Sequence, residues 1–149
     1  MRIYPGLQRA ARSPGEAVVW DYHVILLTSS SAGTYVWDLD TTLPFPSTFP
    51  DYCRATLGGE EELEERFHRR FRAVPAATYL VTLASDRRHM RGEGGWLAEP
   101  PSWPCIRPTE GEEEQEQEEH NLDTFIDTLE EGRGELHTLQ SFLQRFNSL

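Results

Sequence analysis

Apolar and β-branched residues are concentrated in one part of the chain, residues 17–46. Residues 18–28 and 34–39 are rich in valine, leucine and aromatic side chains, and the segment between them, residues 29–33, consists of serine, alanine and glycine. Two such runs separated by turn-forming residues are typical of antiparallel strands. The pattern therefore predicts a β-hairpin here.

Each predicted strand carries an ionisable residue among apolar neighbours, His23 in the first and Asp38 in the second. A four-residue loop, residues 29–32, would place His23 directly opposite Asp38, with Cβ atoms about 4.5–5.5 Å apart. A five-residue loop would turn Asp38 to the other face. We adopt the first register because it gives a carboxylate in an apolar strand a partner.

A carboxylate beside an imidazole has two interpretations, and spacing alone leaves both open. The carboxylate can fix the tautomer of the histidine and stabilise the imidazolium, which is the base half of a nucleophilic triad. The pair can equally be a structural polar contact on a sheet, because ion pairs perturb pKa values without any catalysis.

The rest of the chain predicts helices around this hairpin and an α+β fold. Apolar residues recur every fourth position in 60–73, which favours a helix, and a shorter helix is expected at 50–57 with Cys53 in its first turn. Residues 76–84 fit either a helix or a strand. Asn121 is the expected N-cap of a short helix, and the apolar stripe over residues 136–146 predicts a C-terminal helix on the core.

Three regions are predicted from the distribution of these elements and of charge. Residues 1–16 read as a loose basic lead-in, residues 17–149 as a single domain, and residues 109–120, with seven glutamates, as a disordered acidic loop. With 149 residues the chain is long enough for one core.

Composition excludes several classes of function. The net charge of −11 argues against nucleic acid and anionic membranes as partners, and no apolar run is long enough to span a bilayer. The two cysteines, Cys53 and Cys105, have neither a disulfide nor a zinc spacing, and the five histidines show no metal-binding motif. We therefore expect no metal and no cofactor.

Several short motifs closely resemble the protein N-terminal glutamine amidohydrolase family. The most specific is the string Trp-Asp-Tyr-His-Val at positions 20–24, and the resemblance covers nearly the whole chain from residue 18 onward. The other matching segments are Trp37-Asp38-Leu39-Asp40-Thr41, Leu43-Pro44-Phe45-Pro46, Phe71-Arg72, Ala84-Ser85-Asp86-Arg87, His89-Met90, Pro104-Cys105-Ile106 and Asn121-Leu122.

The resemblance implies an activity and a fold. The family's enzymes are cysteine amidases that convert an N-terminal glutamine to glutamate and release ammonia, a step that marks proteins for degradation by their N-terminal residue. The implied scaffold is papain- or transglutaminase-like, an antiparallel sheet packed with helices. The family's catalytic histidine and aspartate match His23 and Asp38. The implied partner is the N-terminal glutamine of a protein or peptide, and the implied setting is a monomer in the cytoplasm, with the nucleus as a second location.

The family's nucleophilic cysteine precedes the hairpin, at the start of a helix, and this chain has no cysteine before His23. We therefore expect an N-terminally truncated member without the nucleophile helix. Cys53 is the best alternative nucleophile, although an inert buried thiol is the commoner role for such a cysteine. His89 is a candidate second imidazole. The alternative function is an inactive form that at most binds a partner.

Overall fold

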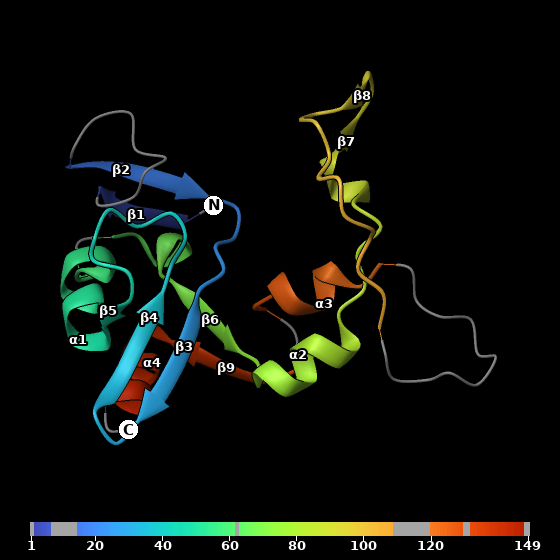
Figure 1. Cartoon of the computed structure of the whole chain (residues 1–149). Helices are drawn as coiled ribbons and strands as arrows, with labels where there is room; N and C mark the ends of the chain where they lie inside the picture. Colours follow the sequence, from blue (N-terminus) through green and yellow to red (C-terminus); the bar gives the residue numbers. More distant parts are fainter. Residues whose placement is uncertain (1, 7–14, 62, 109–119, 130–131, 148–149) are drawn as a thin grey trace. The chain divides into compact units, whose positions relative to one another are not determined.

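The computed structural model describes residues 2–6, 15–61, 63–108, 120–129 and 132–147. Residues 109–119 of the predicted acidic loop, and residues 1 and 7–14 of the predicted lead-in, lie outside the described residues. The chain forms two compact units, Met1–Phe71 with His137–Leu149 and Arg72–Leu136, which we describe separately. Small antiparallel sheets and short helices confirm the α+β class (Figure 1).

The first unit contains two small sheets. Strands β1 (Arg2–Gly6) and β2 (Gly15–Trp20) pair antiparallel, and β3 (Leu26–Ser30), β4 (Gly33–Trp37) and β5 (Ser47–Thr48) form a second sheet in that order. The single strand expected over residues 18–28 is wrong, because β2 ends at Trp20 and the chain reaches β3 only at Leu26. Strand β1 also lies within residues 1–16, where a loose lead-in was expected.

The β3–β4 hairpin has a shorter loop than the sequence predicted. Ser30 lies opposite Gly33 and Leu27 opposite Val36, so the loop is residues 31–32. Gly33 has a φ of 119°, a conformation that side chains disfavour, which explains glycine at the end of this tight turn. The predicted four-residue loop is wrong, and the observed pairing is shifted by two residues from the predicted one, since Thr28 lies opposite Tyr35 and not Gly33. A shift of two keeps every side chain on its original face.

A short helical segment follows β5. Helix α1 (Phe49–Tyr52) continues into the π-helix η1 (Cys53–Leu57), close to the expected 50–57. Thr48 caps α1, since its Oγ1 accepts a hydrogen bond from the backbone N–H of Asp51 at 3.3 Å. Cys53 comes after α1 rather than in its first turn.

The helix predicted over residues 60–73 is wrong. This segment instead contains the 3₁₀ turn η2 (Glu65–Phe67) and the strand β6 (Arg70–Ala73). The Glu60 carboxylate accepts hydrogen bonds from the backbone N–H of Arg69 and from its Nε at 3.0 Å. This contact folds the segment back on itself, and the buried Arg69 side chain could not make it from one continuous helix.

The core of the first unit lies between the β3–β4–β5 sheet and the helices α1, η1 and α4 (Leu139–Asn147). Figure 1 shows α1 beside β5, and α4 lies on the sheet as the expected C-terminal helix. Phe142 of α4 stacks on Phe71 with ring centroids 4.1 Å apart. The buried residues of this core are Val36, Phe49, Tyr52, Leu57, Leu139 and Phe142.

The second unit is built of short elements. It contains α2 (Ala76–Thr82), the 3₁₀ turn η3 (Arg88–Met90), the hairpin of β7 (Arg91–Gly92) and β8 (Gly95–Trp96), and α3 (Leu122–Ile126). Thus residues 76–84 are helical for most of their length. Strand β6 pairs with β9 (Glu135–Thr138).

Two general features concern only the described part of the chain. None of its helices has the length and apolar character needed to cross a lipid bilayer. Its histidine, cysteine and acidic side chains nowhere gather in threes in a way that could hold a metal ion.

Candidate active site

His23 and Asp38 meet in the first unit, as the sequence predicted. Asp38 directly follows β4, and His23 lies in the irregular segment between β2 and β3 rather than in a strand. The His23 Nε2 atom is 2.9 Å from Asp38 Oδ1. The predicted contact is therefore confirmed, although it is made across the end of the ladder and not by directly opposed strand residues.

Two further donors hold the Asp38 carboxylate. The Tyr52 hydroxyl donates to Oδ2 at 2.7 Å, and the backbone N–H of Asp40 donates to Oδ1 at 2.9 Å. Burial raises the pKa of this carboxyl group. The hydrogen bonds from His23, Asp40 and Tyr52, together with the charge of His23, outweigh burial and lower the pKa to about 2. Asp38 is therefore ionised at neutral pH.

The ionised carboxylate determines which nitrogen of His23 carries the proton. A carboxylate only accepts hydrogen bonds, so His23 must donate from Nε2. In the neutral ring, Nδ1 is then the atom that can take up a proton. The arrangement thus supplies an oriented general base, which is the chemistry that activation of a thiol or hydroxyl nucleophile requires.

Trp20 also fixes the orientation of the histidine. Its ring stacks on the imidazole with centroids 5.1 Å apart and planes inclined by 24°. The Trp20 indole N–H is buried and donates no hydrogen bond to any of the described residues. The stack restricts rotation of the ring about its side-chain bonds, so the imidazole is held from one face by Trp20 and at its edge by Asp38.

The two cysteines differ from what a nucleophile needs. Burial raises the pKa of the Cys53 thiol to about 12, so it stays protonated at neutral pH. This environment agrees with the inert role that the sequence favoured for Cys53. Cys105 is exposed and belongs to the second unit.

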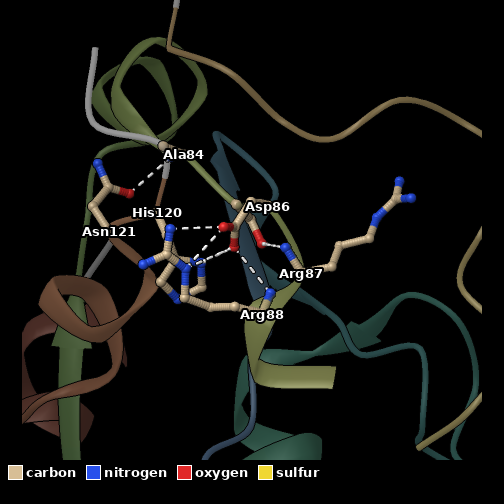
Figure 2. Close-up of polar contacts among 7 residues, drawn as sticks. Ala84, Asp86, Arg87, Arg88, His120 and Asn121 are labelled. Atoms are coloured by element: carbon tan, nitrogen blue, oxygen red, sulfur yellow. Dashed lines mark hydrogen bonds and ion pairs between the residues drawn. The ribbon is translucent and has the colours of Figure 1, made fainter. Parts of the chain in front are cut away.

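Two other imidazoles come together in the second unit. Figure 2 shows His120 Nδ1 beside the carboxylate of Asp86, at 3.2 Å from Oδ1, and the ring of His89 lies 5.9 Å from that of His120. Arg88 binds the same carboxylate, with Nε 2.8 Å and Nη2 2.7 Å from Oδ2. The hydrogen bonds and charge of Arg88 hold the pKa of Asp86 well below its usual range. His89 is thus part of this cluster.

Asn121 occupies the expected N-cap position of α3, but its side chain makes no capping bond. Its amide instead accepts from the backbone N–H of Ala84, which Figure 2 shows, and donates to the carbonyl of Thr82, both at 2.8 Å. Asn121 therefore satisfies the backbone at the end of α2. The predicted N-cap position of Asn121 is therefore correct, but the predicted hydrogen bond to its own helix is wrong.

Comparison with known proteins gives the family of this chain. A family model described as N-terminal glutamine amidase matches residues 3–146. The chain belongs to this family. It is 39% identical over 150 residues to the protein N-terminal glutamine amidohydrolase of Bos taurus, covering 99% of this chain and 69% of that protein. The Homo sapiens protein of the same name is 38% identical, with 99% of this chain and 70% of that protein covered. The Danio rerio protein is 38% identical over 142 residues, with 93% and 66% covered.

Sequence reasoning missed two residues that contact the His23–Asp38 pair, Trp20 and Tyr52. Trp20 belongs to the string that identifies the family, but the spacing of apolar residues gives it no role beyond the strand. Tyr52 precedes the candidate cysteine by one residue and is separated from Asp38 by fourteen positions. No periodicity connects a helix residue to a strand end, so only the tertiary structure reveals this contact.

Proposed function

We propose that this protein removes ammonia from the N-terminal glutamine of proteins and peptides, with His23 as the base and Asp38 as the residue that orients it. The observation that carries the proposal is the 2.9 Å contact between His23 Nε2 and the buried Asp38 carboxylate. Membership in the amidase family and the names of the relatives support the substrate.

The proposed reaction proceeds through a thioester. His23 Nδ1 takes the proton from a cysteine thiol, and the thiolate attacks the side-chain amide carbon of glutamine. The tetrahedral intermediate collapses as His23 returns the proton to the amide nitrogen, which leaves as ammonia. Water then attacks the thioester, giving glutamate and the free thiol. Asp38 stabilises the imidazolium in each half of this sequence.

The thiol is the part of the proposal that the family resemblance supplies, since it implies a cysteine that precedes His23. Cys53 fits poorly because burial raises the pKa of its thiol to about 12, which leaves almost no thiolate at neutral pH. This observation favours a second candidate function, in which the chain binds the N-terminus of a substrate or partner without turnover.

Ammonia release from a Gln-initiated peptide separates the two candidates. Under the first proposal, a form of the protein that carries the cysteine preceding His23 should release ammonia, and in that form His23→Gln or Asp38→Asn should slow release more than about a hundredfold. His68→Gln is the matched control, because His68 is exposed and its Nε2 lies 3.1 Å from the carbonyl of Leu63. Undiminished release from His23→Gln would end the assignment of the base.

The cysteines are tested in the same assay. Loss of ammonia on Cys53→Ser, with Cys105→Ser unchanged, would identify Cys53 as the nucleophile despite its burial. No release from the wild-type chain, together with saturable binding of the Gln-initiated peptide but not of its Ala-initiated counterpart, would establish the second candidate.

The cellular setting remains part of the proposal. We expect a monomer in the cytoplasm, with the nucleus as a second location. Sedimentation of the purified chain tests the first expectation, and fractionation of cells that express it tests the second.

A further inference from the structure

We infer that Tyr52 is a positioning residue for the His23–Asp38 pair, an inference that rests on the proposed function. The Tyr52 hydroxyl donates to Asp38 Oδ2 at 2.7 Å, while His23 and the N–H of Asp40 engage Oδ1 at 2.9 Å. Because the two oxygens are held from different directions, the carboxylate cannot rotate about its Cβ–Cγ bond without breaking a hydrogen bond. Tyr52 thereby keeps Oδ1 directed at the imidazole.

The Tyr52 ring is itself held in place. It is 1% exposed and belongs to the core cluster with Val36 and Phe49. Its helix, α1, begins at a capped end, where Thr48 Oγ1 donates to Asp51 Oδ2 at 2.7 Å as well as accepting from the Asp51 backbone. A buried ring on an anchored helix has little freedom, so its hydroxyl is a fixed donor and not an adaptable one.

The phenol also affects the charge of the carboxylate. A hydroxyl that donates to an ionised group makes a stronger hydrogen bond than it makes to a neutral one. Burial raises the pKa of Asp38, and Tyr52 is one of the donors that bring it down to about 2. An ionised, correctly rotated carboxylate holds the proton of His23 on Nε2 and leaves Nδ1 as the base. Tyr52 therefore acts through Asp38 and need not touch the substrate.

Tyr52→Phe isolates this role because it removes one oxygen atom and keeps the packed ring. Tyr35→Phe is the matched control: Tyr35 lies in β4 of the same unit, and alternation along the strand places it on the face opposite Val36 and Asp38. The readouts are the ¹³C titration of the Asp38 carboxyl group and the ¹⁵N shifts of the His23 ring, assigned with Asp38→Asn and His23→Gln.

We expect Tyr52→Phe to raise the titration midpoint of Asp38 by about one pH unit, the effect of losing one hydrogen bond to a charged group. The His23 signals should change from a single Nε2–H tautomer to a mixture of both. Tyr35→Phe should change neither. In the ammonia assay, Tyr52→Phe should slow release about tenfold, with its acid limb displaced to higher pH, whereas Tyr35→Phe should match the wild type.

The outcomes distinguish this inference from the proposed function. An unchanged Asp38 midpoint in Tyr52→Phe would overturn the inference, whatever the rate. A raised midpoint with an unchanged rate and pH profile would also overturn it, because positioning would then not matter for the reaction. Wild-type release that survives His23→Gln would overturn the proposed function alone. A slowly exchanging Tyr52 hydroxyl proton in the wild-type spectrum tests the contact without any substitution, and its absence would count against the inference.

Discussion

Two pairs of imidazole and carboxylate stand in the two units of this protein, and their environments differ more than their distances do. His23 Nε2 is 2.9 Å from Asp38, and His120 Nδ1 is 3.2 Å from Asp86. The Asp38 side chain is 0% exposed, whereas that of Asp86 is 32% exposed. Asp38 receives neutral donors, the Tyr52 hydroxyl and the Asp40 N–H, while Arg88 places its guanidinium on Asp86.

The difference shows why proximity alone does not make a catalytic dyad. The charge of Asp86 is largely compensated by Arg88, so little of it is available to stabilise a proton on His120. Neutral donors orient Asp38 without cancelling its charge, which remains directed at His23. Low water access strengthens that interaction further. The difference therefore supports our proposal that the first pair carries the chemistry and that the second is structural.

The largest expected difference between the two pairs is in the rate of ammonia release. His23→Gln should slow ammonia release from a Gln-initiated peptide more than about a hundredfold, because the general base is lost. His120→Gln should stay within about twofold of the wild type, because its partner is already bound by Arg88. Equal losses in the two variants would show that the second pair also takes part in the reaction.

The next effect concerns the free energy of unfolding. Asp38→Ala leaves the buried Tyr52 hydroxyl and the Asp40 N–H without their acceptor and should lower this free energy by about 3 kcal/mol. Asp86→Ala should lower the free energy of unfolding by less, since Arg88 is exposed and water can solvate its guanidinium once the carboxylate is removed. Urea titrations followed by circular dichroism measure both. A smaller loss for Asp38→Ala than for Asp86→Ala would reverse our ranking.

A third effect is the acid sensitivity of the first pair. The pKa of Asp38 is about 2 in the folded protein, below its ordinary value near 3.8, so its contribution is present above pH 4. That contribution, about 2 kcal/mol, should be lost as the pH falls from 4 toward 2. Asp38→Asn should remove this part of the pH dependence. Parallel stability curves for the two proteins between pH 5 and pH 2 would contradict the depressed pKa.

The smallest effect compares the two cysteines. Cys53 is partly buried with a pKa raised to about 12, and Cys105 is exposed. Iodoacetamide at pH 8 should therefore label Cys105 about tenfold faster or more in the native protein, because burial limits both the access and the ionisation of Cys53. Mass spectrometry of timed samples gives the two rates, and unfolding in urea should equalise them. Faster labelling of Cys53 would reveal an accessible thiolate at that position.

The sequence by itself determined the class of fold, the meeting of His23 and Asp38, and the family. These predictions rest on patterns that are local in sequence. The faces of the hairpin stay the same when the pairing shifts by two residues, and the short motifs indicate the family without a structure. The helix expected over residues 136–146 is confirmed from Leu139 onward, where its apolar stripe is continuous in sequence, whereas Leu136 belongs to β9.

The tertiary structure alone decided the features that depend on distant contacts. Residues 60–73 have a helical spacing, but the Glu60–Arg69 contact and the pairing of β6 with β9 override it. Asn121 binds the backbone of Ala84 rather than its own helix. Tyr52 reaches Asp38 because α1 packs on β4, and hydrophobic burial, which is non-directional, gives no sequence signal for which hydroxyl will face which carboxylate.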